Sequence, residues 1–295
     1  LQSTLGRHAE AEVSLRHALG LSPRHADALT CLAVMCATQQ RAAEAEELFR
    51  AALDAAPGRP DISSAFARLL TETGRADEAL AVVRAAQHRN RGDLMMQGKL
   101  CMTLNYVDGV DPQKLLAQHR RFGKLAPTGD PIPVADPDPG RRLRIGYLSG
   151  DLREHSVAYF LEPLLENHDR DAFEVFCYHV GRPDPAPPRL AAEADHWRPL
   201  LPITDEALLS AIRADHLDIL IELGGHTSSS RLIAIARRAA PIQVSAIGYP
   251  NTTGLPSIDA RIVDAITDPP GSETFATERL VRLDHCFLCY RPPES

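Results

Sequence analysis

The sequence has 295 residues, a length typical of about two domains, and its 44% of hydrophobic residues indicates globular units with apolar cores. The net charge is -7, and no stripe of Lys or Arg interleaved with aromatic residues is present, which argues against nucleic-acid binding. No apolar run reaches the roughly 18 residues that a membrane-spanning helix needs, so no membrane partner is expected.

We expect no export signal at the start of this sequence. Residues 1–4 lack the basic segment and apolar run of a secretory signal peptide, and they lack an initiator Met. We therefore expect the sequence to begin inside a longer chain. Its six cysteines are scattered through apolar surroundings, which is typical of reduced thiols and favours a cytoplasmic location.

The first hundred residues contain an internal repeat. The motif Gly6-Arg7-His8-Ala9-Glu10-Ala11 returns at positions 40–45 and 74–79, a step of 34 each time (6, 40, 74). Gly74, like Gly6, falls where a turn between helices takes a left-handed residue. Pro23 and Pro57 keep the same step and fall where a helix must stop. A strict period of this length indicates helix pairs that bury their apolar faces by stacking.

This repeat resembles the tetratricopeptide repeat over about residues 1–91, and residues 93–126 form a further helical segment. We predict a superhelical repeat domain at residues 1–126, whose groove binds acceptor proteins or peptides. An ordinary helical bundle is the alternative, but it would not require a strict period.

The composition changes after the repeats. The run at residues 127–140 is rich in proline and predicts an extended linker. Residues 141–295 then alternate between strand and helix patterns, which indicates an α/β lobe with a mostly parallel sheet. The expected strands are residues 143–148, 173–180, 219–223 and 242–247, and the expected helices are residues 157–165, 206–213 and 232–238.

Three loops of this lobe follow expected strands, at residues 149–156, 224–230 and 248–254. They are rich in Gly, Ser and Thr, and the first two carry His155 and His226. Ligands of parallel sheets bind at the carboxyl ends of the strands. Hydroxyls and backbone N–H groups there suit a polyhydroxylated or phosphorylated ligand. Helix capping and turn formation are the alternative for any single loop.

Other sequence motifs exclude several classes of enzyme. No complete dinucleotide-binding motif, phosphate-binding P-loop or G-x-S-x-G elbow is present. Cys286 and Cys289 form a C-x-x-C, but no second ligand pair follows, so a pair of strand cysteines is favoured over a metal or redox site.

The loops resemble the amino-terminal catalytic lobe of the O-linked glycosyltransferases typified by O-GlcNAc transferase and SPINDLY. The similar segments are residues 144–149, 155–160, 173–178, 218–223, 225–227, 240–244 and 247–256. The order of repeats and lobe also matches. The chain departs from the family pattern at Gly150, where a proline is common. The resemblance implies tetratricopeptide repeats followed by a Rossmann-like lobe, one half of a GT-B fold.

The resemblance also implies an activity and a site. Family members transfer a sugar from a nucleotide diphosphate to Ser or Thr of a protein held near the repeats, without an essential metal or other cofactor. His155 matches the family's active-site histidine. The resemblance leaves two alternative roles for it, a general base and a positioning group. The other implied substrate-binding residues are His226, Thr227, Pro250, Asn251, Thr252, Thr253 and Gly254. A structural role for His226 remains open, and the remaining histidines are expected to be structural or exposed.

The family's second lobe, which holds most nucleotide contacts, is not part of this sequence. We therefore expect the chain alone to have little or no transferase activity. UDP-GlcNAc and, as in the SPINDLY branch, GDP-fucose are both open as donors. A repeat adaptor without enzymatic activity is the competing function.

Overall fold

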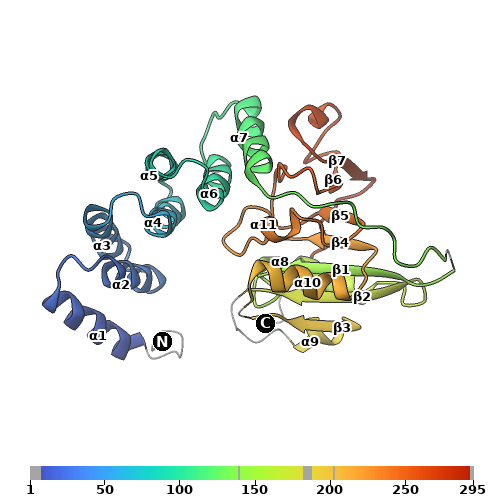
Figure 1. Ribbon diagram of the computed structural model, residues 1–295, viewed down its shortest axis with the longest axis horizontal. Helices are drawn as coiled ribbons and strands as arrows, with labels where there is room; N and C mark the ends of the chain where they lie inside the picture. The colour runs from blue at the N-terminus through green and yellow to red at the C-terminus, as the bar shows by residue number, and fades with distance from the viewer. Residues whose placement is uncertain (1–7, 139, 182–187, 202, 293–295) are drawn as a thin grey trace. The chain divides into compact units, whose positions relative to one another are not determined.

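The computed structural model describes residues 8–138, 140–181, 188–201 and 203–292 (Figure 1). The chain divides into two compact units, Leu1–Asp111 and Pro112–Ser295. The sequence places the end of the helical domain at residue 126, whereas the last helix of that range, Pro112–Leu125, groups with the second unit. The reason lies in packing, because this helix contacts the polar loops of the second unit.

The first unit is built from helices that pack on their neighbours along the chain. Buried alanines let the helices approach closely, and Ala45 and Ala79, like Ala52 and Ala86, are one repeat apart. The described helices are α1 (His8–Leu21), α2 (Ala26–Thr38), α3 (Ala42–Ala55), α4 (Pro60–Glu72), α5 (Ala76–Arg89) and α6 (Leu94–Leu104). The sequence period therefore corresponds to a structural repeat.

The turns of the repeats follow the predicted pattern. Gly74 has φ +78°, and Gln40, one repeat earlier, takes the same left-handed conformation with φ +63°. The equivalent Gly6 lies outside the described residues. Pro23 and Pro57 follow the ends of α1 and α3, as expected of residues that cannot continue a helix.

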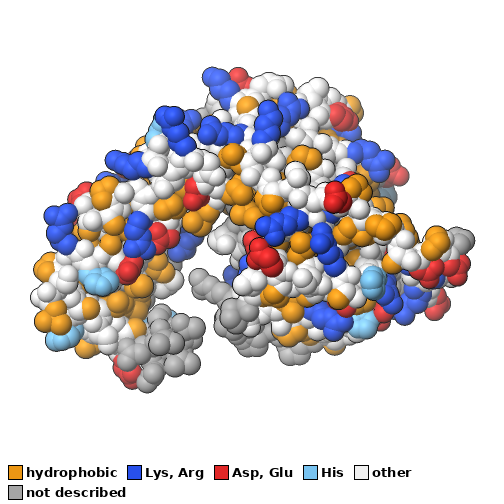
Figure 2. All heavy atoms as spheres, viewed as in Figure 1, with side chains coloured by type: hydrophobic (Ala, Val, Ile, Leu, Met, Phe, Trp, Pro, Cys, Tyr) orange, Lys and Arg blue, Asp and Glu red, His pale blue; other side chains and the backbone are white. Residues whose placement is uncertain are grey.

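An ion-pair ladder also repeats along the first unit. Arg41 bridges Glu12 and Glu44, and one repeat later Arg75 bridges Glu46 and Glu78. Basic and acidic side chains consequently lie beside one another on this unit (Figure 2). The ladder links successive repeats through their surface.

The second unit contains a seven-stranded parallel sheet in the order β3-β2-β1-β4-β5-β6-β7 (Figure 1). Its described strands are β1 (Leu143–Ser149), β2 (Phe173–His179), β3 (His196–Pro199), β4 (Ile219–Glu222), β5 (Ile242–Ser245), β6 (Ala260–Asp264) and β7 (Arg279–Leu283). Its described helices are α7 (Pro112–Leu125), α8 (Ser156–Glu166), α9 (Pro188–Ala192), α10 (Asp205–Ala214), α11 (Leu232–Ile235) and the short 3-10 helix η1 (Ser272–Phe275). The predicted fold class, helical repeats followed by a parallel α/β lobe, is confirmed.

Several elements differ from the sequence expectation. Strands β3, β6 and β7 were not predicted, because they are short and carry charged or polar residues that weaken the apolar strand pattern. Helix α11 is shorter than predicted, since Arg238 has φ +58° and the Gln243 side chain donates to the Ile235 carbonyl and accepts from the Ala239 amide. A buried glutamine thus ends this helix.

The core of the second unit lies between α8 and the sheet. Val157, Leu161 and Leu165 of α8 pack with Ile145 and Val175 of the strands in one buried cluster. This packing fixes α8, and with it the loop that connects it to β1.

Two further observations complete the fold. Cys286 and Cys289 lie after β7 and outside any strand, so the interpretation as strand cysteines was wrong; the edge strand ends at Leu283. In the described part of the chain, none of the helices has both the length and the apolar character required to cross a bilayer.

Candidate functional site

The three polar loops of the lobe leave neighbouring strands at one edge of the sheet. Strand β4 pairs in parallel with both β1 and β5, so their carboxyl ends lie side by side. Residues 149–156, 224–230 and 248–254 follow these ends. The prediction that the loops share one sheet edge is therefore confirmed.

Glycines bring these loops into close contact. A β-carbon added at Gly150 would lie 2.2 Å from Cβ of Ser229, and one added at Gly225 would lie 2.2 Å from Cβ of Tyr249. A β-carbon added at Gly248 would lie 1.9 Å from the Leu223 carbonyl oxygen. Only glycine leaves room for these approaches, so the loops form one continuous surface.

His155 is the N-cap residue of α8, the helix that follows the first loop. Its Nδ1 accepts a hydrogen bond from the Val157 amide (3.2 Å), and its Nε2 lies 4.0 Å from Oδ1 of Asp151. Its side chain is 35% exposed, while Asp151 is buried. Because Nδ1 accepts, the proton of the neutral ring lies on Nε2.

The second loop is held from below by a buried carboxylate. Glu222, the last residue of β4, accepts hydrogen bonds from the amides of Gly224 (2.6 Å) and Gly225 (2.7 Å). Burial raises the pKa of Glu222 to about 7, although the two amides act in the opposite direction. Within the described residues, Oγ1 of Thr227 is buried and has no hydrogen-bond partner, although the residue as a whole is half-buried.

His226 lies inside an aromatic cluster and is itself buried. Its ring contacts His119, Phe122 and Tyr249, with centroid distances of 5.2, 4.5 and 5.3 Å. Its Nε2 donates to the Thr253 carbonyl (2.8 Å), which joins the second loop to the third. Burial lowers the pKa of His226 to about 3, so the ring is neutral.

Helix α7 supplies the other half of this cluster. His119 donates through Nδ1 to the Leu115 carbonyl and accepts through Nε2 from the Tyr249 hydroxyl (2.7 Å). Burial lowers the pKa of His119 to about 4. A β-carbon added at Gly123 would lie 1.9 Å from the carbonyl oxygen of Gly254. The helix therefore packs backbone to backbone against the third loop.

The third loop is partly exposed and partly buried. Pro250 is exposed and Asn251 half-buried, while Thr252, Thr253 and Gly254 are buried. Thr252 and Thr253 donate hydrogen bonds to the buried carboxylate of Glu278, and the Gly254 amide donates to the Thr252 hydroxyl. Among the loop residues expected to bind substrate, Pro250 and Asn251 are therefore the ones with exposed surface.

Sequence reasoning did not identify three residues that support the site. Glu222 was treated only as part of a strand, His119 as a structural or exposed histidine, and Glu278 was not singled out. His119 and Glu278 are far from the loops in sequence and belong to no motif. Glu222, two residues before Gly224, was the one available signal, since a strand-terminal carboxylate can accept from the amides of the following turn.

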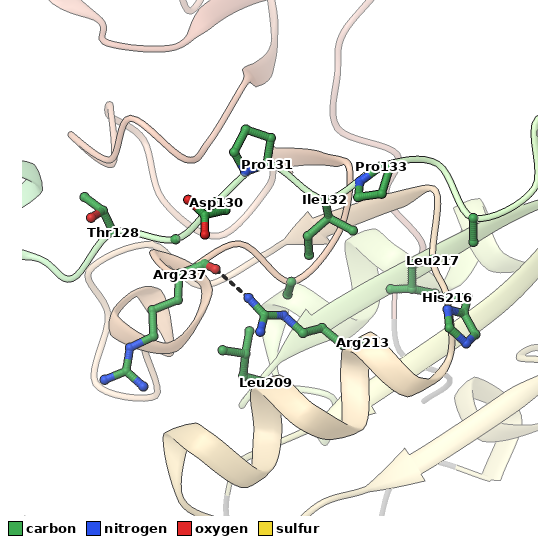
Figure 3. Close-up of a pocket in the computed structure, with 13 residues that line it drawn as sticks. Thr128, Asp130, Pro131, Ile132, Pro133, Leu209, Arg213, His216, Leu217 and Arg237 are labelled. Atoms are coloured by element: carbon green, nitrogen blue, oxygen red, sulfur yellow. Dashed lines mark hydrogen bonds between the residues drawn. The ribbon is translucent and has the colours of Figure 1, made fainter.

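A pocket of about 670 Å³ lies elsewhere in the second unit, between the linker and helix α10 (Figure 3). It is lined by Leu217 and Ala239, which precede β4 and β5, so it lies at the amino ends of these strands. Arg213 points across it and donates to the Arg237 carbonyl (2.7 Å) (Figure 3). The linker is extended there, and Arg213 holds the turn that follows α11.

Comparison with known proteins identifies the family. Residues 132–290 match the model of glycosyl transferase family 41, and residues 2–60 and 37–100 match models of the tetratricopeptide repeat. The chain therefore belongs to glycosyl transferase family 41 and carries tetratricopeptide repeats. The resemblance drawn from the loops is confirmed.

Individual relatives agree with this family. The chain is 41% identical over 208 residues to an Arabidopsis thaliana protein named probable UDP-N-acetylglucosamine--peptide N-acetylglucosaminyltransferase SPINDLY. The match covers 66% of this chain and 22% of that protein. It is 36% identical over 172 residues to the Arabidopsis protein SEC, which has the same enzyme name. That match covers 57% of this chain and 18% of SEC. The chain thus spans about a fifth of the length of these curated relatives.

A solved structure covers both units. A point mutant of Thermobaculum terrenum O-GlcNAc transferase matches with a TM-score of 0.91 and 34% identity. The match covers 99% of this chain and 57% of that chain. The succession of helical repeats and parallel lobe is therefore shared with a protein of that name.

Proposed function

We propose that this chain is the repeat arm and amino-terminal catalytic lobe of a protein O-glycosyltransferase. In the reaction, a Ser or Thr hydroxyl oxygen of an acceptor protein attacks the anomeric carbon of a nucleotide sugar. The bond from that carbon to the diphosphate breaks, and the hydroxyl proton leaves. The observation that carries the proposal is the mutual contact of three polar loops at one sheet edge in a chain of this family.

Two properties of the site support roles for its residues. His155 has its Nδ1 engaged by the helix, so its neutral ring presents an N–H at Nε2 and suits a positioning donor better than a base. Thr227, which is half-buried, would contact the sugar together with Pro250 and Asn251 on the exposed part of the third loop. His226 would act by holding the Thr253 carbonyl.

The wider context of the reaction follows from the chain's composition and relatives. The relatives' names specify UDP-N-acetylglucosamine and peptide, which supports that donor, with GDP-fucose as the alternative. The repeats would bind the acceptor proteins. Six free cysteines support a reducing, cytoplasmic location.

The decisive experiment is mass spectrometry of Ser/Thr peptides incubated with the protein in its full natural length and either donor. Transfer would add one N-acetylhexosamine from UDP-GlcNAc or one deoxyhexose from GDP-fucose. A peptide that binds the repeats but gains no mass with either donor would contradict the proposal and favour the repeat adaptor.

A further inference from the structure

The buried carboxylate of Glu278 lies beneath the third loop. It accepts hydrogen bonds from the amide of Thr253 (2.7 Å at Oε1) and from the hydroxyls of Thr252 (2.5 Å at Oε2) and Thr277 (3.1 Å at Oε2). The Thr253 hydroxyl also donates to Oε1. An ionised carboxylate in such a position needs these donors, because its burial is otherwise unfavourable.

These bonds determine the direction of both loop hydroxyls. An ionised carboxylate only accepts, so Thr252 and Thr253 must each give their single hydroxyl proton to Glu278. Oγ1 of Thr252 then accepts from the amides of Gly254 (3.2 Å) and Thr277 (3.1 Å). Its proton and both lone pairs are engaged, and no hydrogen-bonding capacity remains for a ligand.

The second threonine is similarly occupied. Oγ1 of Thr253 accepts from the Leu255 amide (3.2 Å), and its carbonyl accepts from Nε2 of His226 (2.8 Å). Both threonines are fully buried. The inner half of the loop thus wraps around one carboxylate, and its outer half is left to face the ligand.

We propose that Glu278 is a positioning residue for the sugar-binding loop and that Thr252 and Thr253 act through it rather than by touching the donor. The inference rests on the proposed function, which places the sugar against this loop. It changes the role of the two threonines from ligand contacts to groups that hold Pro250 and Asn251 in place.

Hydrogen exchange on residues 1–295 tests the loop part of the proposal without any activity. The Thr253 amide should exchange at least about tenfold faster in Glu278→Gln than in the wild type, since the amide side chain adds a donor where only acceptors fit. Glu273→Gln is the matched control, because Glu273 is exposed and pairs with Arg282 on the surface. Unchanged exchange in Glu278→Gln would overturn the proposal.

A double-mutant cycle on the full-length enzyme tests the link to transfer. Glu278→Gln and Thr253→Val should each lower kcat by about tenfold or more with little change in the donor KM, because a misplaced loop impairs orientation of the sugar. The double variant should be no worse than either single variant, whereas Thr253→Ser should restore activity. Multiplying effects would show a direct contact between Thr253 and the donor and would overturn the proposal.

The two experiments separate the possible failures. If the wild-type enzyme transfers no sugar, the proposed function fails, and hydrogen exchange still decides whether Glu278 shapes the loop. If Glu278→Gln does not fold, Thr252→Val offers an isosteric change at the same carboxylate. It should likewise accelerate exchange of the Thr253 amide, and unchanged exchange would count against the proposal.

Discussion

The chemistry of the site depends on which atoms of individual residues are already engaged. Nδ1 of His155 caps α8, and Nε2 of His226 holds a loop carbonyl. Two histidines that look alike in sequence therefore differ: the side chain of His155 is 35% exposed, whereas that of His226 is buried and neutral. Gly150 and Gly225 matter equally, because each lets two loops touch.

Two variants of His155 separate its capping role from its role in transfer. Asn keeps a cap acceptor for the Val157 amide, so thermal stability should stay close to wild type while transfer falls by about 100-fold. Ala should lose the same activity and in addition about 1 kcal/mol of stability. Thermal denaturation and initial rates on the full-length enzyme measure the two effects. Full activity of the Asn variant would remove the ring from the reaction.

A pair of glycine variants measures the cost of loop contact. Gly74 and Gly225 both have positive φ, but only at Gly225 does an added β-carbon meet a neighbour. Gly74→Ala should cost about 1–2 kcal/mol of unfolding free energy from backbone strain. Gly225→Ala should cost about 1–3 kcal/mol more, since Tyr249 must move. Equal losses in urea unfolding of the respective units would show that the loops separate freely.

At the scale of elements, helix α7 looks like a continuation of the repeats in sequence but is part of the lobe by packing. Its residues His119 and Phe122 contact His226. The ion-pair ladder of the first unit is the contrasting case, because it repeats with the sequence period and stays on the surface. Helix α7 supports the site, whereas the ion-pair ladder supports the stacking of the repeats.

Removing α7 should damage the lobe. A fragment of residues 112–295 retains the helix, and a fragment of residues 127–295 exposes the buried ring of His226 and the backbone of Gly254. We expect the shorter fragment to melt at a temperature lower by several degrees and to bind more of a hydrophobic dye, because the ring contacts of His119 and Phe122 with the loops are lost. Equal melting temperatures would show that α7 is a separate element.

The ladder should make the repeats sensitive to acid. The Arg75 and Arg50 guanidinium groups lower the pKa of Glu46 to about 2, below its ordinary value of 4.5. This contribution to stability is present above pH 4.5 and is lost as the pH falls toward 2. Arg75→Gln should weaken this dependence, as should high salt. Arg68→Gln, which removes a pair within one helix, is the control, and equal acid profiles for both variants would contradict the prediction.

At the scale of the whole molecule, two buried groups of the second unit oppose each other in their pH dependence. His119 has a lowered pKa, so the unfolded chain binds more protons below pH 6.5 and stability falls as the pH decreases. Glu222 has a raised pKa, so the folded chain holds its proton longer, and stability falls as the pH rises from 4.5 to about 7.

Neutral substitutions should shift the balance in opposite directions. His119→Gln, which still offers Tyr249 an acceptor, should raise stability at pH 5 relative to pH 7. Glu222→Gln should raise stability at pH 7 relative to pH 5. Urea unfolding at pH 5 and pH 7 measures the free energy of unfolding of each variant, and the difference between the two pH values is compared with that of the wild type. A shift of the same sign in both variants would contradict the assigned titrations.

The sequence by itself determined the repeats, the parallel lobe and the three loops at its edge. These features are local or periodic: a 34-residue step, strand-helix alternation, and Gly-rich segments directly after apolar runs. Each can be recognised without knowing which distant residues it meets. Family membership also followed from such local motifs, because the loops are contiguous in sequence.

Only the tertiary structure decided which atoms of those loops remain available. His119 and Glu278 approach the site from distant elements of the chain. His119 contacts the ring of His226, and Glu278 accepts hydrogen bonds from the hydroxyls of Thr252 and Thr253. A motif shows that a hydroxyl is present but cannot show that a buried carboxylate already receives its proton. For the same reason α7 belonged to the repeats in sequence and to the lobe in space: backbone approach at Gly123 and Gly254 depends on packing rather than on period.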